Sequence, residues 1–240
     1  MALLEVEGIK KRFRGRTVVN NVSFTVEEGQ TVGLLGPNGA GKTTSFRMIV
    51  GMLTPEAGTV HFRGEDVTGL PMFKRARKGM GYLAQEPSIF QRMTVRQNIL
   101  AVLEARGMAR EERNERTDRT LEEFGLTRLA GGKAHSLSGG ERRKLEMARA
   151  LATSPSLLLL DEPFSGVDPI AVSGLQEVIR SLGKRGIGIL LTDHSVRETL
   201  KVTDRAYIIR EGNILVHGTS EFLINDPEAR EHYLGRDFEM

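Results

Sequence analysis

Residues 36–43 read GPNGAGKT, with glycine, lysine and threonine at every fixed position of the pattern G-x-x-x-x-G-K-[ST]. The stretch follows the β-branched run Thr31–Leu35, which predicts a strand, and it opens a segment to about Gly51 that predicts a helix. Glycine-rich loops of this kind turn successive backbone N–H groups toward phosphate oxygens, and the helix start adds about half a positive charge. The stretch therefore predicts a phosphate-binding loop, although a plain strand–loop–helix connection is the alternative.

The loop also contains the side chains that a nucleoside triphosphate and Mg²⁺ require. The Lys42 ammonium is expected on the β- and γ-phosphates, and the Thr43 hydroxyl is expected to ligate Mg²⁺. The predicted ATP-binding residues of this loop are Gly36, Pro37, Asn38, Gly39, Ala40, Gly41, Lys42, Thr43 and Thr44.

An unbroken apolar run, Ser156–Leu160, precedes the adjacent acids Asp161 and Glu162. Such a run is typical of a strand covered on both faces, as in a parallel sheet with helices on each side. Asp161 at its end can reach the Mg²⁺ shell through water, and Glu162 can orient or deprotonate the attacking water. Two acids at a strand end can also form a simple turn. Together with the phosphate-binding loop, they predict a P-loop nucleotide hydrolase.

The composition argues against a nucleic-acid-binding, secreted or membrane-spanning protein. The chain has 240 residues, of which 39% are hydrophobic and 27% charged, and these are ordinary globular values. A net charge of +3 is too weak to indicate a nucleic-acid-binding protein, and the absence of cysteine suits a reducing cytoplasm. The first residues do not resemble a signal peptide, and no run approaches the roughly 20 apolar residues of a membrane span. We therefore expect a soluble protein that contacts a membrane only through partners.

The rest of the chain alternates short apolar runs with helical patterns, which predicts an α/β core interrupted by a helical stretch at about 90–150. Further strands are expected at Ser23–Val26, Gly58–Phe62, Met80–Leu83, Ile187–Leu191, Ala206–Ile209 and Ile214–Val216. Further helices are expected from Thr94 to about Gly107 and over Arg110–Phe124, Gly139–Ala152 and Ile170–Gly183. The charged runs Lys74–Lys78 and Arg110–Arg119 are interpreted as solvated helix faces, with a lipid or partner contact as the alternative.

A second glycine-rich segment opens a helix and forms another anion site; its residues are Leu137, Ser138, Gly139, Gly140 and Glu141. Two such helix starts in one chain require either two nucleotides or a second copy that completes the site. The segment stands about twenty residues before the strand that ends in Asp161, and in this the sequence resembles the ABC ATPase family, whose signature motif is LSGG. The resemblance implies a head-to-tail homodimer in which the signature of one subunit covers the ATP held by the other.

The same resemblance implies roles for several single residues. Phe13 would stack on adenine, where the family more often has Tyr, and the alternative is a core aromatic. Gln85 would contact Mg²⁺ and the attacking water, and His194 would contact the γ-phosphate; an unremarkable strand-end glutamine and a structural histidine are the alternatives. The loop that links the two ATP sites would comprise Ser165, Gly166, Val167 and Asp168.

The fold implied by the resemblance is an α/β P-loop NTPase of the ABC ATPase type, forming one domain over residues 1–240. Residues 1–86 and 152–240 would form a RecA-like mixed-sheet core with an antiparallel β subdomain and a C-terminal tail. Residues from about 90 to 151 would form an inserted α-helical subdomain. Phe90 is expected either to anchor a coupling helix of a membrane partner or to fill its own core.

Longer segments, among them YLAQEPSIFQRMTVRQNI and SLSGGERRKLEMARAL, resemble the ATPases of lipopolysaccharide-export systems. The ending His232–Phe238, HYLGRDF, is typical of that group, whereas Ala84, Phe13 and Arg236 depart from its usual proline, tyrosine and acid. The resemblance implies two transmembrane permease subunits, a single-span component and a location at the cytoplasmic face of the inner membrane. The alternatives are the ATPase of a branched-chain amino-acid importer and a soluble ABC ATPase such as an iron–sulfur assembly factor.

Overall fold

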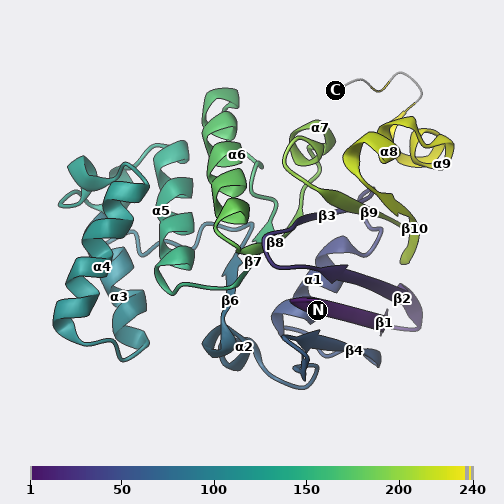
Figure 1. The fold of residues 1–240 in the computed structure, drawn as a ribbon, viewed down its shortest axis with the longest axis horizontal. Coiled ribbons are helices and arrows are strands. Elements are labelled where there is room, and N and C mark those ends of the chain that lie inside the picture. Colours follow the sequence, from purple (N-terminus) through teal and green to yellow (C-terminus); the bar gives the residue numbers. More distant parts are fainter. Residues whose placement is uncertain (1, 236–237, 239–240) are drawn as a thin grey trace.

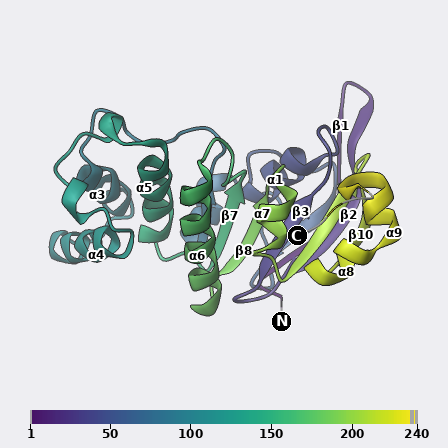
Figure 2. The same ribbon diagram turned by 90° about the horizontal axis from the view of Figure 1, so that it is seen from above.

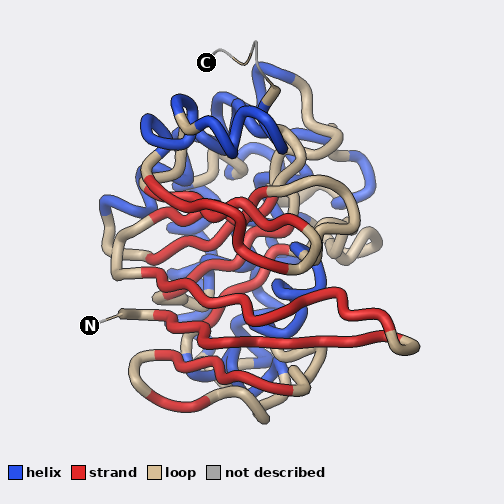
Figure 3. The backbone as a smooth tube through the Cα atoms, turned by 90° about the vertical axis from the view of Figure 1, so that its right-hand side faces the viewer, coloured by secondary structure: helices blue, strands red, loops and turns tan. Residues whose placement is uncertain are grey.

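Two β-sheets organise the computed structural model, which describes residues 2–235 and 238 (Figure 1). The strands of this part of the chain are β1 (Leu4–Phe13), β2 (Arg16–Val26), β3 (Thr31–Leu35), β4 (Ala57–Phe62), β5 (Glu65–Asp66), β6 (Met80–Leu83), β7 (Leu157–Asp161), β8 (Gly188–Thr192), β9 (Arg205–Arg210) and β10 (Asn213–Gly218). One sheet is antiparallel, in the order β2-β1-β4-β5. The other has the order β10-β9-β3-β8-β7-β6, and all its neighbours pair in parallel except β9 and β10. Figure 3 shows the hairpin of β1 and β2 extending beyond the other strands.

Some helices pack against the sheets, and others group together at one end of the molecule. They are α1 (Lys42–Val50), α2 (Met72–Lys78), α3 (Val95–Ala105), α4 (Arg110–Glu123), α5 (Gly139–Ala152), α6 (Pro169–Lys184), α7 (Val196–Leu200), α8 (Ser220–Asn225) and α9 (Pro227–Ala229), with short turns at Thr127–Leu129 and Ala134–Ser136 and a π-helical turn at Arg230–Leu234. Figures 1 and 2 place α3, α4 and α5 together at one end, with α6 between them and the six-stranded sheet. None of the helices in residues 2–235 has the length and apolar character needed to span a bilayer.

The three central parallel strands of the six-stranded sheet are buried along their whole length, as the apolar runs at 156–160 and 187–191 predict for two of them. Every residue of β3, β7 and β8 is buried. Leu157 and Leu159 belong to the hydrophobic cluster shared with β1, β4 and α1, whereas Leu158 and Leu160 belong to the cluster shared with α3, α5 and α6. Successive side chains therefore enter opposite layers, so β7 is covered on both faces.

The predicted local signals at helix ends are confirmed. Thr94 caps α3 with a reciprocal capping box, in which its side chain accepts from the backbone N–H of Gln97. Gly51 ends α1 in the left-handed conformation. Strand β1 was not predicted from the sequence, because its apolar alternation (Leu4, Val6, Ile9) is interrupted by a register shift beside Gly8.

Arg75 corrects the interpretation of Lys74–Lys78 as a solvated helix face. Its side chain is 1% exposed, although neighbouring residues of α2 are exposed. The guanidinium donates to the carbonyls of Met48 and Ile49 at 2.8 and 2.6 Å, which lie in the last turn of α1. It also donates to the carbonyls of Leu70 and Thr68. Arg75 therefore supplies donors to helix-end carbonyls and a cation at the negative end of the α1 dipole.

A second buried arginine joins α5 to the end of β7. Arg143 forms an ion pair with Glu146 at 2.9 Å, and both side chains are buried. Its guanidinium also donates to the carbonyl of Ala84, which follows β6, and to those of Asp161, Glu162 and Pro163. A carboxylate oxygen of Glu146 accepts the backbone N–H of Ser88 at 2.8 Å. This pair therefore fixes the helix that opens at residue 139 against both strands that lead into the candidate site.

The C-terminal residues that the structure describes pack on α7. Tyr233, Leu234 and Phe238 lie against a small cluster that includes Leu200 and Leu223. The Arg197 guanidinium lies 5.5 Å from the ring centroid of Phe238. Arg236 and Asp237, which belong to the ending compared above, lie outside the described residues.

We expect Arg75→Met to lower the free energy of unfolding by about 3 kcal/mol, because buried carbonyls lose their donors. Arg75→Lys keeps a cation but cannot serve four carbonyls, so it should lie between wild type and Arg75→Met. Lys74→Met, on the exposed part of the same helix, is the control and should change stability by less than about 0.5 kcal/mol. Urea unfolding measures all three, and equal effects of Arg75→Met and Lys74→Met would contradict the assignment.

For the ion pair, we expect Glu146→Gln to lower the free energy of unfolding by about 3 kcal/mol, since it leaves the Arg143 charge buried without its counterion. Arg143→Met should have a similar cost. The double variant should cost less than the sum of the two, with a coupling of about 2 kcal/mol, because the second change removes the stranded charge. A double-mutant cycle by urea unfolding tests this, and additive effects would show that the two side chains do not stabilise each other.

Candidate functional site

The phosphate-binding loop lies between β3 and α1, as the sequence predicts. Gly36 and Gly41 have φ values of 150° and 110°, which disfavour L side chains. A Cβ at Gly36 would overlap the carbonyl oxygen of Ile209, and one at Gly41 would lie 2.6 Å from that of Val18. The sequence analysis assigned the loop glycines to the approach of phosphate alone. The structure adds a second reason, because β9 and β2 leave no room for a side chain there.

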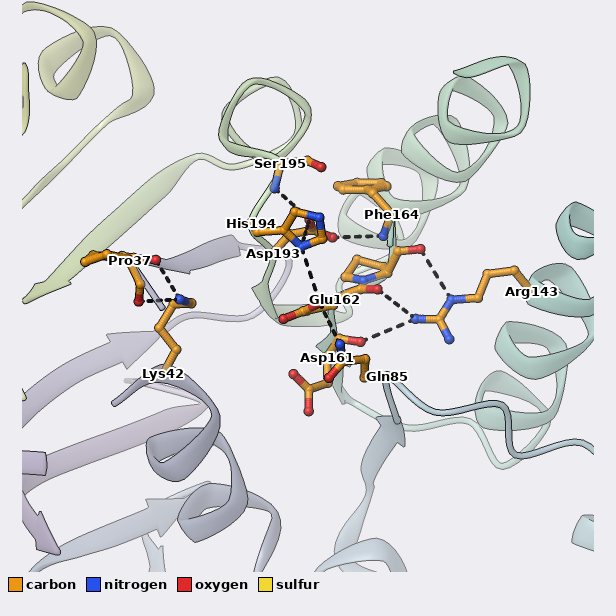
Figure 4. A network of polar contacts seen from close by, with 12 residues as sticks. Pro37, Lys42, Gln85, Arg143, Asp161, Glu162, Phe164, Asp193, His194 and Ser195 are labelled. Atoms are coloured by element: carbon orange, nitrogen blue, oxygen red, sulfur yellow. Dashed lines mark hydrogen bonds and ion pairs between the residues drawn. The ribbon is translucent and has the colours of Figure 1, made fainter. Parts of the chain in front are cut away.

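Lys42 opens α1 and folds over the loop (Figure 4). Its ammonium donates to the carbonyls of Gly36 at 2.6 Å and Pro37 at 3.0 Å. The side chain is 7% exposed, and this burial lowers its pKa, while the carboxylates at the ends of β7 and β8, Glu162 foremost, oppose the shift. The Lys42 ammonium is therefore close enough to those carboxylates for their negative charge to favour its protonated form.

The other residues predicted to bind ATP lie around the loop. Pro37, Asn38, Gly39 and Ala40 line a cavity of about 700 Å³ together with Arg16–Val18 of the β1–β2 hairpin, Arg210 and Glu211. Thr43 and Thr44 lie half-buried in the first turn of α1. Phe13, at the end of β1, is 44% exposed, so the alternative of a core aromatic is excluded.

Asp161 ends β7, and its carboxylate is incompletely hydrogen-bonded. The Tyr82 hydroxyl on β6 donates to Oδ2 at 3.3 Å, whereas Oδ1 is buried and has no partner among the described residues. Burial raises the pKa of Asp161, and the hydrogen bond from Tyr82 opposes this. Burial, followed by the nearby charge of Asp161, raises the pKa of Tyr82 to about 12, so the phenol stays protonated at neutral pH.

The donor set around Asp161 fits a divalent cation that is shared with a nucleotide. The part of the chain that the structure describes has no group of three His, Asp or Glu side chains able to hold a metal. A hard cation prefers oxygen ligands, and the Thr43 hydroxyl and, through water, the unpaired oxygen of Asp161 would be available to it here.

Glu162 is contacted by the two residues that the sequence analysis assigned to the reaction with it. Gln85 Nε2 donates to its Oε2 at 2.8 Å, and His194 Nδ1 lies 3.3 Å from the same oxygen. The backbone of Glu162 adopts a left-handed φ of 47°, and its N–H donates to the carbonyl of Thr192 at 2.7 Å. A non-glycine residue in this conformation is strained, and such strain is held where the surroundings fix it.

Asp193 was not identified from the sequence, although it fixes both loops of the site. It is fully buried, and its carboxylate accepts the backbone N–H groups of Phe164 at 2.9 Å and Ser195 at 2.8 Å (Figure 4). The loop after β7 and the loop after β8 are thereby held together, with Glu162 on one and His194 on the other. An acid directly after a buried strand is the sequence signal that could have indicated it.

The segment Leu137–Glu141 opens α5 with a reciprocal capping box. The Ser138 hydroxyl accepts from the backbone N–H of Glu141, whose carboxylate accepts in turn from the Ser138 backbone at 2.9 Å, and the Ser138 hydrogen bonds lower the pKa of Glu141. Ser138 and Gly139 are exposed. Figures 1 and 2 place α5 far from α1, so within this chain the segment does not meet the phosphate-binding loop.

The loop after Phe164 leads from Glu162 to α6. Ser165 N–H donates to the carbonyl of Glu162, Gly166 has a φ of 68°, and Asp168 caps α6 by accepting from the N–H of Ala171 at 3.0 Å. Val167 packs partly buried against the core.

Phe90 lies beside a groove of about 630 Å³ between α2, α3 and α5. Its side chain is 45% exposed, which excludes the alternative of a core plug. The Arg149 guanidinium lies 4.7 Å from its ring centroid. Arg149 lines the groove together with Phe73, Tyr82 and Ala105.

Comparisons with known proteins agree with this geometry. The family model described as ABC transporter matches residues 19–165. The chain is 51% identical over 238 residues to the lipopolysaccharide export system ATP-binding protein LptB of Acidithiobacillus ferridurans, covering 99% of each chain. It is 48% identical over 241 residues to the protein of that name from Escherichia coli, covering 100% of each. A crystal structure of an ATP-binding cassette of an ABC transporter in its ADP conformation matches 98% of this chain and 100% of its own, with a TM-score of 0.88 and 29% identity.

The match to the family model, the full-length identity and the arrangement of the phosphate-binding loop lead to one conclusion. The chain belongs to the ABC transporter family and is one of its ATP-binding, ATP-hydrolysing subunits.

Proposed function

We propose that Glu162 is the residue that orients and deprotonates the water attacking the γ-phosphate. The observation that carries this is the pair of contacts on one carboxylate oxygen, from Gln85 at 2.8 Å and His194 at 3.3 Å. A general base must lie within hydrogen-bond reach of the proton that it abstracts, and these two contacts hold the Glu162 carboxylate in one orientation. His194 is then placed to contact the γ-phosphate, and Gln85 to contact the attacking water.

In this proposal the P-loop residues and Mg²⁺ bind the triphosphate. Lys42 leaves the carbonyls of Gly36 and Pro37 and places its ammonium on the β- and γ-phosphates, where its charge opposes theirs. Thr43, Gln85 and, through water, Asp161 hold Mg²⁺, which when bound neutralises charge on the phosphate oxygens. Phe13 stacks on adenine from the exposed hairpin end.

We propose a head-to-tail homodimer because the segment 137–141 has no phosphate to bind within its own chain. Gly139 and Gly140 are the first residues of α5, where backbone N–H groups have no intrahelical partner and can bind an anion, and α5 lies away from the phosphate-binding loop. A second copy would bring that segment onto the γ-phosphate, and Ser165–Asp168 would connect the two sites. ATP then holds the dimer closed, because its contacts to the second subunit exist only in the closed state.

The transported substrate is inferred from the relatives. About 50% identity over the full length joins this chain to proteins named for lipopolysaccharide export. We therefore propose that it powers extraction of lipopolysaccharide from the inner membrane, at the cytoplasmic face, with two permease subunits and a single-span component. The surface for a permease helix comprises Phe90, Arg149 and the adjacent groove. The α-helical subdomain, at about residues 90–151, would move relative to the RecA-like core.

Replacing Glu162 by Gln should abolish turnover while ATP still binds, because the amide cannot take a proton from water. We expect kcat to fall by about 10²- to 10⁴-fold. The variant should accumulate as a dimer in ATP and Mg²⁺, measured by phosphate release and by light scattering after size exclusion. Glu177→Gln, an exposed change on α6, is the control. A monomeric Glu162→Gln variant with unimpaired hydrolysis would overturn both the base assignment and the dimer.

Replacing Phe90 by Ala should release the membrane partners without loss of the ATPase activity of the isolated subunit. The test is affinity purification from detergent-solubilised membranes, with Phe222→Ala as the control because Phe222, on α8, is 51% exposed against 45% for Phe90. Recovery of two transmembrane subunits and a single-span component, lost in Phe90→Ala, is the expected result. Recovery of a permease pair with a periplasmic amino-acid-binding protein would instead assign the chain to an importer.

A further inference from the structure

Tyr82 directs its hydroxyl at the carboxylate that the proposed reaction uses. It lies on β6, three positions before Gln85, and donates to Asp161 Oδ2 at 3.3 Å. Since Oδ1 has no partner, this is the one protein hydrogen bond to that carboxylate within residues 2–235. The sequence motifs give Tyr82 no role of its own, and the proposed reaction does not use it.

The surroundings of this hydrogen bond have room for ordered water. Tyr82, Gln85 and Asp161 line one cavity of about 330 Å³, and the charged residues Arg47 and Glu86 line it as well. A water molecule occupies about 30 Å³ of liquid, so several fit. The proposed contact of Asp161 with the metal runs through water, and it therefore depends on which way the carboxylate is turned.

Packing around the Tyr82 ring restricts the position of its hydroxyl. The ring is half-buried against the cluster that contains Phe46, and the two ring centroids are 6.5 Å apart at an interplanar angle of 47°. Phe46 belongs to α1, whose first residues form the phosphate-binding loop. One aromatic contact thus ties the hydroxyl donor to the helix that carries Lys42 and Thr43.

We propose that Tyr82 is a positioning residue that orients the Asp161 carboxylate for the metal of a metal–nucleotide complex. This rests on the proposed Mg²⁺ site. Hydrogen bonds from outer residues to metal-binding side chains set the orientation of the ligand, and their loss commonly lowers metal affinity by about 10-fold or more. Tyr82 acts on the metal and not on the nucleotide itself, which distinguishes this role from a general contribution to folding.

The test is Tyr82→Phe, which keeps the ring and removes only the hydroxyl. Mn²⁺ affinity is measured by electron paramagnetic resonance in the presence of a non-hydrolysable ATP analogue, and binding of a fluorescent ATP analogue is measured in EDTA. We expect Mn²⁺ affinity to fall by about 10-fold and nucleotide binding in EDTA to stay within about twofold of wild type. Tyr207→Phe, which removes a hydroxyl from the buried middle of β9, is the matched control and should change neither.

The outcomes separate this inference from the proposed function. Wild-type Mn²⁺ affinity in Tyr82→Phe overturns the positioning role, and so does an equal loss of nucleotide binding with and without metal, which indicates a general structural effect. If wild type with the ATP analogue binds no Mn²⁺, the proposed metal site itself is wrong. A fall confined to the metal, and absent in Tyr207→Phe, supports the inference.

Discussion

The parallel pairing of β3, β8 and β7 is the constraint on which the candidate site depends. In parallel strands the carboxyl ends meet at one edge of the sheet, so residues far apart in sequence emerge side by side. The phosphate-binding loop leaves β3 there, Asp161 and Glu162 leave β7, and Asp193 and His194 leave β8. These strands are buried on both faces, so the hydrophobic clusters on either side of the sheet hold the strand ends in place.

Two buried arginines bind backbone carbonyls of neighbouring elements and so position helices around the sheet. Arg143 connects α5 to the ends of β6 and β7, and Arg75 connects α2 to the end of α1. Each guanidinium offers several donors in a fixed plane, so one side chain can satisfy carbonyls from different elements. The helices therefore keep defined positions relative to the site through contacts that do not involve its reacting groups.

Much of the site could be predicted from sequence because its residues lie next to strong local signals. GPNGAGKT and the acids after Leu160 stand at strand ends, and apolar runs locate those ends without any tertiary information. The roles of Gln85 and His194 came only from resemblance to the family, and their contacts with Glu162 were not predicted, since no local pattern joins the three residues. Arg75, Asp193 and Tyr82 were missed for a common reason. Their partners are carbonyls, N–H groups or carboxylates brought close only by the fold, and a lysine- and arginine-rich run looks solvated in sequence.

Tyr82 lies between two separate surface features of the molecule. Its ring lines the groove beside Phe90 as well as the cavity at Asp161, and among the described residues no other side chain lines both. Any ligand or substitution in the groove that displaces Tyr82 would therefore also displace the hydroxyl that bonds to Asp161, so the groove and the proposed metal-binding carboxylate share one side chain.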